Sequence, residues 1–161
     1  MEQEEINVDD DYPAWLGNDL INDRLPWKKG LHISFLEFAN KYTLHDSCWI
    51  GLFYDVGDRA SAILVINWDA VWLPDSLALS NSKVQEWPFL FIKIEKVKEV
   101  STLDYFNNDY ANWSICDHQI ESIDEQQLLI ISSCMGGDLE ITFSGETTFL
   151  ALDFGRNILN I

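Results

Sequence analysis

The fold is decided by residues 34–74, which read SFLEFANKYTLHDSCWIGLFYDVGDRASAILVINWDAVWLP. The stretch begins with Ser34 and Glu37 at the spacing of a capping box. In that motif the serine oxygen accepts a hydrogen bond from a backbone N–H of the first turn, and the glutamate reaches back to the cap. The spacing predicts a short helix from Ser34 to about Asn40, with an apolar side to bury.

Two strongly apolar segments follow this helix after a turn at residues 44–47. They are Cys48–Tyr54 and Ala60–Trp72, and turn residues at 55–58 separate them. Both segments are rich in β-branched and aromatic residues, which favours strands. We therefore expect two strands that form the nucleus of a sheet.

The second of these segments is apolar on both of its faces. Period two places one set of apolar residues on a single face, and the opposite face is only half polar. The aligned set is Ala60, Ala62, Leu64, Ile66 and Trp68. A strand of this kind is central and covered on both sides. We expect the short helix to cover one side and the N-terminal segment the other.

The remainder of the chain adds further strands to this nucleus. Phe89–Val97 alternates as a half-exposed antiparallel strand does, and residues 99–112 have the composition of a loop. A meander with hairpin-type connections follows, and its segments are Trp113–Ile123, Gln127–Ser133, Leu139–Phe143, Thr147–Leu152 and a short closing strand in Asn157–Ile161. The pattern predicts one α+β domain over residues 1–161. Its main part is a mostly antiparallel β-sheet of six to seven strands, curled or sandwich-like, with a short N-terminal helix.

Residues 1–30 form an acidic N-terminal segment. Residues 1–23 contain no Lys or Arg, yet Tyr12–Ile21 carries aromatic and aliphatic side chains that a solvating tail does not need. We expect Tyr12–Ile21 to dock on the domain or on a partner. The first residues are acidic, whereas a secretory signal begins with positive charge, so we expect a cytoplasmic protein.

The net charge of −17 on 161 residues limits the class of partner. Such a field repels nucleic acid and anionic lipid and attracts basic proteins. No apolar run approaches the roughly 20 residues that a membrane helix needs. We therefore expect no nucleic acid and no membrane as partners, and a basic protein as the ligand. The alternative is that the acidity serves only solubility.

No motif for catalysis, for a cofactor or for a metal stands out. His45 and Asp46 could form an acid–base pair, but Asp and Ser side chains also bond nearby backbone in turns, and that structural interpretation is favoured here. Cys116-Asp117-His118 is the only local metal candidate, and it lacks a second ligand pair. We expect no enzyme activity, no cofactor and no metal.

Two acidic and aromatic stretches are the predicted partner-binding surfaces. Trp68 and Trp72 flank Asp69, and an exposed group of this kind would be a hot spot for a partner's cation. Buried tryptophans are the alternative. The second stretch is an acidic, aromatic patch formed by Asp104, Tyr105, Asp109 and Tyr110.

His45-Asp46-Ser47, followed by Trp49 and a β-rich continuation, resembles small acidic immunity proteins of bacterial polymorphic and contact-dependent toxin systems. The likeness covers Ser34 to about Val97. It implies a non-catalytic protein that binds one cognate toxin, often a nuclease, and blocks it. The alternatives are a small structural or adaptor domain without a toxin partner, and, less favoured, a hydrolase that uses His45 and Asp46.

Overall fold

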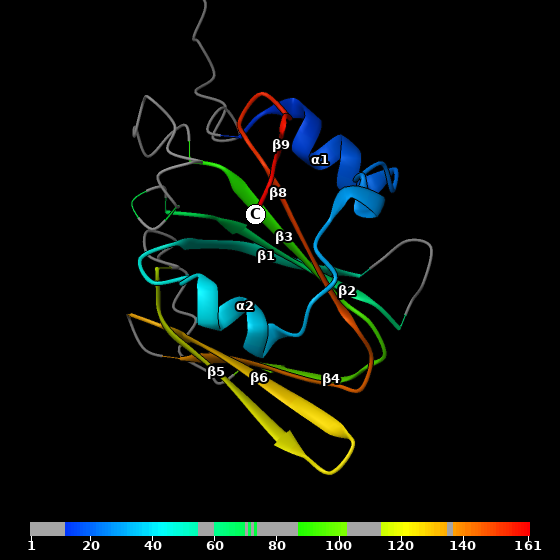
Figure 1. Cartoon of the computed structure of the whole chain (residues 1–161), viewed down its shortest axis with the longest axis vertical. Coiled ribbons are helices and arrows are strands. Elements are labelled where there is room, and N and C mark those ends of the chain that lie inside the picture. The colour runs from blue at the N-terminus through cyan, green and yellow to red at the C-terminus, as the bar shows by residue number, and fades with distance from the viewer. Residues whose placement is uncertain are drawn as a thin grey trace, which may run out of the picture.

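The computed structural model describes residues 12–54, 60–69, 71, 73, 87–102, 114–134 and 137–161. These residues form two α-helices near the N-terminus, one 3₁₀ helix and nine strands in two antiparallel sheets (Figure 1). The predicted α+β, mostly antiparallel class is confirmed. The number of strands exceeds the expected six or seven, and a second helix precedes the one that the capping box predicts.

The helical elements are α1 (Ala14–Ile21), the 3₁₀ helix η2 (Trp27–Lys29) and α2 (Phe35–Lys41). Sheet A contains, in spatial order, β1 (Cys48–Tyr54), β2 (Ala62–Asn67), β3 (Phe89–Ile94), β8 (Thr147–Leu152) and β9 (Ile158–Leu159). Sheet B contains β4 (Val97–Thr102), β7 (Asp138–Phe143), β6 (Gln126–Ser133) and β5 (Ile115–Ile123). No helix in the described part of the chain is long and apolar enough to cross a membrane.

The capping box forms as predicted at the start of α2. The Ser34 hydroxyl oxygen accepts a hydrogen bond from the backbone N–H of Glu37 at 3.1 Å. The same hydroxyl lies 3.3 Å from the Glu37 carboxylate and donates to it. The glutamate therefore reaches the side chain of the cap, and α2 begins at Phe35 with its first turn satisfied.

Strand β2 lies in the middle of the molecule and is covered on both faces. Leu64 and Ile66 belong to an inner core that includes Phe38 of α2. Ile63 and Val65 point to the other face, where they pack with residues of α1. Helix α2 and the N-terminal segment thus cover opposite faces of sheet A, as the sequence predicted.

Strand β3 departs from the expected half-exposed strand. All of its residues are buried except Lys93, because α1 and η2 cover the face that was expected to meet solvent. The strand also ends earlier than predicted. The chain bends at Lys96, whose φ of 53° is left-handed, and continues as β4 in sheet B where a loop was expected.

The two sheets meet at this bend. The chain returns from β7 to β8 alongside it, and Gly145 donates its N–H to the Glu95 carbonyl. A Cβ atom at position 145 would lie 2.4 Å from that carbonyl oxygen. Glycine is therefore required here because the two backbones approach so closely.

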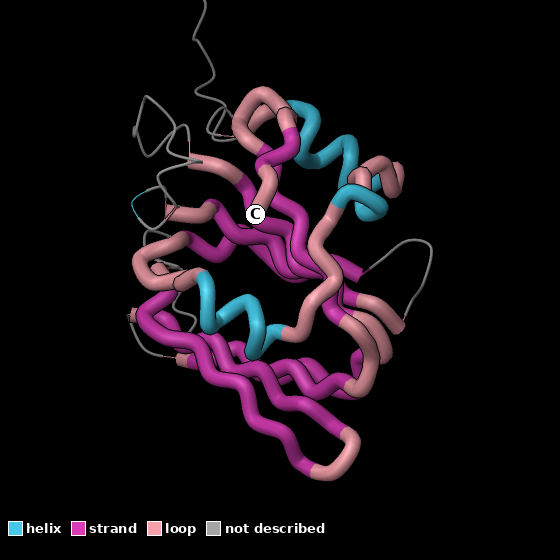
Figure 2. Tube along the Cα trace, in the orientation of Figure 1, coloured by secondary structure: helices cyan, strands magenta, loops and turns pink. Residues whose placement is uncertain are grey.

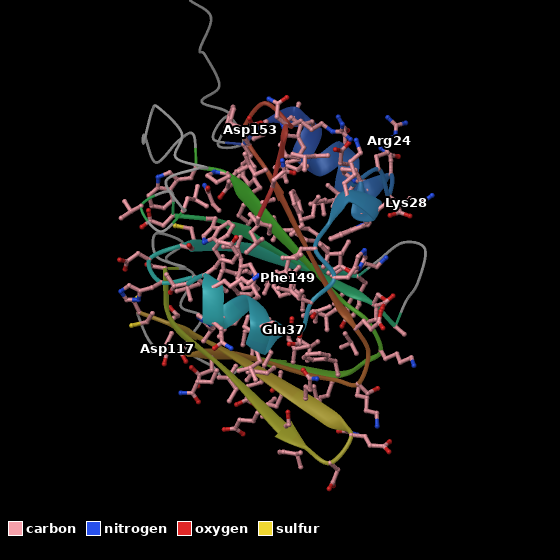
Figure 3. All side chains as sticks on the ribbon, viewed as in Figure 1. Arg24, Lys28, Glu37, Asp117, Phe149 and Asp153 are labelled. Carbon is pink, nitrogen blue, oxygen red and sulfur yellow. The ribbon has the colours of Figure 1, made fainter. Side chains whose placement is uncertain are left out.

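Aromatic rings fill the space between α2 and sheet A. Phe149 of β8 stacks on Phe38 with ring centroids 4.2 Å apart and an interplanar angle of 3°. Phe35 packs against both rings, and all three side chains are fully buried. Phe149 lies among the side chains between the sheets (Figure 3). This aromatic core fixes α2 against both sheets.

Candidate functional site

The predicted surface at Trp68 and Asp69 is buried, so the expectation of an exposed hot spot there is wrong. Trp68 has no exposed surface, and its indole N–H donates to the Thr43 carbonyl at 2.9 Å. The period of β2 carries Trp68 onto the inner face, where it packs against Phe38 and Tyr42. The indole therefore serves the core.

Asp69 is only 6% exposed and is held by backbone. Its carboxylate accepts the N–H of Val71 at 3.0 Å, and its own N–H donates to the Ser47 hydroxyl at 2.9 Å. The carboxylate closes a local turn instead of facing a partner. The remaining predicted partner-binding residues, Trp72, Asp104, Tyr105, Asp109 and Tyr110, lie outside the described residues.

The turn at His45-Asp46-Ser47 ties the start of β1 to the start of β5. Asp46 adopts a left-handed conformation with φ 62°, which Asp tolerates better than most residues. Its N–H donates to the Ile115 carbonyl, and the Ile115 N–H donates to the Ser47 carbonyl. The segment is a structural junction between the sheets, as the favoured interpretation expected.

The His45 ring takes part in this junction. Its Nδ1–H donates to the Cys116 carbonyl at 2.8 Å, and Nε2 lies 3.5 Å from a carboxylate oxygen of Asp46. The side chain is 45% exposed and lines neither of the two concave sites described below. A ring held through Nδ1 on a backbone carbonyl is oriented by the fold, so His45 has a structural role in this junction.

The side chains of the metal candidate Cys116-Asp117-His118 do not point toward a common centre. Cys116 and Asp117 are exposed, while the His118 ring turns inward. It packs edge-to-face with the Phe35 ring, with the two ring centroids 5.7 Å apart. Within the described ranges, no three His, Cys, Asp or Glu side chains are arranged to hold a metal ion.

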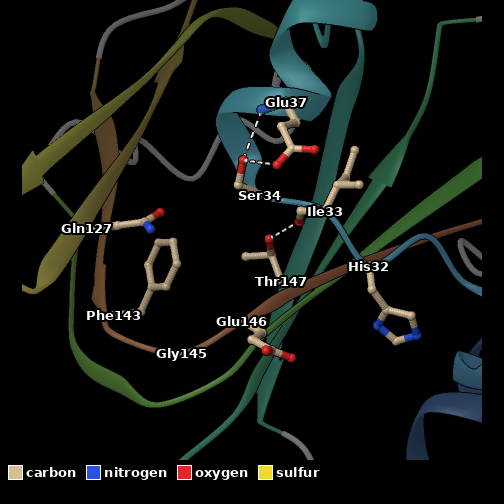
Figure 4. Close-up of a pocket in the computed structure, with 9 residues that line it drawn as sticks. All are labelled: His32, Ile33, Ser34, Glu37, Gln127, Phe143, Gly145, Glu146 and Thr147. Carbon is tan, nitrogen blue, oxygen red and sulfur yellow. Dashed lines mark hydrogen bonds between the residues drawn. The ribbon is translucent and has the colours of Figure 1, made fainter.

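A polar pocket opens between the start of α2 and the β7–β8 corner (Figure 4). Its volume is about 310 Å³, and its walls come from both ends of the chain. Phe143 and Gln127 lie on one side, and Ile33 and Thr147 lie on the other, where the Thr147 hydroxyl donates to the Ile33 carbonyl (Figure 4). The carboxylates of Glu37 and Glu146 are exposed at this pocket, so it suits the ammonium or guanidinium group of a ligand.

An apolar groove of about 470 Å³ lies between α1 and β1. It includes several of the largest exposed apolar side chains of the described residues, namely Tyr12, Ile21, Phe53 and Tyr54. Among the described residues, no charged side chain lines it. The groove forms because α1 packs Leu16 and Trp15 over the centre of sheet A and leaves the surface near β1 uncovered.

The sequence and the structure of the chain give no match to known proteins, whether family models, curated proteins or solved structures. The function is therefore inferred from geometry and charge alone.

The sequence did not indicate the pocket or the groove. His32, Glu37 and Glu146 belong to distant segments that meet only because β8 pairs beside β3 and receives the bridge from Leu31. No local motif marks such a pocket. The apolar content of Tyr12–Ile21 predicts that this segment docks on the domain. It does not predict the groove between the docked segment and β1.

His118 makes stability depend on pH. Burial lowers the pKa of its imidazole, and the neighbouring Asp117 only partly offsets this shift. The unfolded chain titrates near the ordinary value of about 6.5, so below that pH it binds more protons than the folded chain does. Stability contributed by neutral His118 is thus present above about pH 6.5 and declines as the pH falls toward the lowered pKa.

We expect a measurable difference between the wild-type chain and His118→Phe. The wild-type melting temperature should fall more between about pH 7.5 and 5.5 than that of the variant, because only the wild-type chain must protonate a buried ring. His32→Asn, at an exposed histidine, is the matched control and should fall as the wild type does. Equal declines in the wild-type chain and His118→Phe would refute the assignment.

Proposed function

We propose that this chain is a non-catalytic binding protein, an immunity protein that neutralises a basic toxin by binding it. The observation that supports the proposal is the net charge, since the chain contains 27 Asp and Glu residues and only 10 Lys and Arg residues. A toxin that acts on nucleic acid must itself be cationic to hold a polyanion. An acidic inhibitor gains association rate and specificity against such a partner.

The structural roles of the two candidate catalytic residues also favour binding over catalysis. His45 is oriented by a backbone carbonyl and Asp46 forms a turn, so both have structural roles. The polar pocket presents carboxylates suited to a Lys or Arg side chain. These features fit recognition of a cationic surface.

The test is capture of a partner from native lysate on the immobilised chain, with stepwise elution by salt and identification by mass. The purified partner is then assayed with and without the chain. We expect a single basic protein whose activity is blocked at equimolar chain. Its association rate should fall by about tenfold as salt rises from low to high ionic strength, because screening removes the steering field.

Binding without inhibition would favour the adaptor interpretation, in which the acidity serves solubility. An association rate that is independent of salt would remove the electrostatic argument for an immunity protein. A partner that is acidic or neutral would overturn the proposal outright.

A further inference from the structure

Sheet B has one covered face and one open face. Helix α2 and sheet A lie on one side of it, and no other described helix or strand lies on the opposite side (Figure 2). The covered face contributes Leu129, Ile131, Ile141 and Phe143 to the inner core. Because side chains alternate along a strand, the residues between them point outward.

The register of the strands fixes which residues share the open face. Leu128 pairs with Glu121 on one side and with Thr142 on the other. In the neighbouring row, Ile130 pairs with Gln119 and with Glu140. The Ser101 hydroxyl donates to the Glu140 carboxylate at 3.4 Å, which shows that β4 presents the same face.

Two apolar side chains occupy the middle of this open face. Leu128 and Ile130 are partly exposed and belong to neither hydrophobic core cluster. Carboxylates surround them on the outward positions of the other three strands, β4, β5 and β7, namely Glu99, Asp117, Glu121, Asp138 and Glu140. Among the residues of these strands the only cation is Lys98, which lies in the bulge at the start of β4.

This arrangement is not explained by folding. Carboxylates gathered on one sheet face repel one another, and a partly exposed Leu and Ile gain little from their position. An apolar centre with a charged rim is instead the anatomy of a protein–protein interface, where the centre is desolvated and the rim sets specificity.

The charge decides what can cover this face. A second copy of the chain would bring another −17 and the same carboxylates, and nucleic acid or anionic lipid would bring further negative charge. A surface with Lys or Arg around an apolar centre is complementary. The apolar groove beside α1 does not indicate an occupant in this way, because the described residues that line it carry no charge.

We propose that the open face of sheet B is the docking surface for a basic partner protein, with Leu128 and Ile130 at its centre. This assignment rests on the proposed function and names the surface that performs it. The carboxylates of β4, β5 and β7 pair with the partner's cations, and the two apolar side chains of β6 pack against an apolar spot between those cations.

The test uses the full chain and two charge variants matched in net charge. The first is Glu99→Gln/Glu121→Gln/Glu140→Gln on the face. The control is Asp23→Asn/Asp46→Asn/Asp153→Asn, which removes as many carboxylates from turns outside this face and outside the polar pocket. Asn tolerates the left-handed backbone of residues 23 and 46 and keeps the side-chain oxygen that accepts at position 153. A double variant, Leu128→Thr/Ile130→Thr, tests the apolar centre of the face. Its control is Phe53→Thr/Tyr54→Thr at the apolar groove.

The probe is a synthetic peptide of alternating Lys and Leu, and the partner captured from lysate is measured in the same way. We expect the face triple and Leu128→Thr/Ile130→Thr each to weaken binding by about tenfold or more, and both controls by less than about threefold. Amide NMR shifts on titration should be centred on β6. Circular dichroism confirms that each variant is folded, and the charge triple suffices if the Thr pair does not fold.

Equal losses in the two charge triples would overturn the docking face while leaving a basic partner in place. A larger loss in Phe53→Thr/Tyr54→Thr would move the interface to the groove. Failure of the probe to bind would also overturn the face. Failure of the proposed function is separate, since it would show as a partner that binds here without being inhibited.

Discussion

Replacing Trp68 with Ala is expected to lower the free energy of unfolding by about 3–5 kcal/mol. The indole is fully buried and packs against Phe38 and Tyr42. Its removal leaves a cavity at the point where the end of β2 meets α2. It also leaves the Thr43 carbonyl without the indole N–H that it accepts at 2.9 Å.

The measurement is equilibrium unfolding in urea, followed by circular dichroism. Trp68→Phe should lie between the wild-type chain and Trp68→Ala, because it keeps much of the ring but loses the donor, at a cost of about 1–3 kcal/mol. Val71→Ala, at a residue that is 73% exposed, is the control and should change stability by less than about 0.5 kcal/mol. A Trp68→Ala cost no larger than that of Val71→Ala would contradict the buried position.

Replacing Arg156 with Met is expected to destabilise the chain by about 2 kcal/mol. The Arg156 guanidinium donates through Nε to the Asp19 carboxylate at 2.6 Å, and through a terminal nitrogen to the Arg24 carbonyl at 3.2 Å. The Asp19 side chain is only 8% exposed, so the substitution leaves a largely buried carboxylate without its cation. The interaction joins α1 to the turn before β9.

The control is the double variant Asp19→Asn/Arg156→Met, which removes both charges. We expect it to recover part of the lost stability, since the buried position then holds no uncompensated charge. Hydrogen exchange should show faster exchange in α1 for Arg156→Met than for the double variant. If the single and double variants are equally destabilised, the carboxylate is not the cause.

The parts of the fold that were predictable depend on local patterns. The capping box gave α2 to within a residue, and composition bounded by turn residues gave β1 and β8 with their observed bounds. The apolar character of β2 on both faces also predicted its cover on each side. These features are encoded within short windows, where backbone spacing determines which side chains can share a face.

Other features could not be predicted because they depend on pairing between distant segments. Strand β3 alternates as a half-exposed strand does, and only the packing of α1 and η2 buries it. The bend at Lys96 needs a left-handed non-glycine residue, which no turn motif in the sequence signals. The flanking of Asp69 by two tryptophans favours a surface position for Trp68, whereas the period of β2 places it with Leu64 and Ile66, and the structure follows the period.

The candidate interfaces also depend on pairing between distant segments. The open face of sheet B is defined by the register of four strands, which the sequence does not specify. The composition of residues 99–112 predicts a loop, whereas Glu99 is part of β4 and faces the same side as Glu140. The net charge of −17, which needs no structure, favours a basic partner.

The position of β8 sets the order in which the chain can assemble during synthesis. Strands β1, β2 and β3 are made first and pair as neighbours, but β3 must wait for Thr147–Leu152 to leave the ribosome before its second edge is closed. Until then, the nascent chain presents an unpaired apolar edge of the kind that invites aggregation. Translation that stalls between Ile94 and Thr147 should therefore yield chains that depend on chaperones.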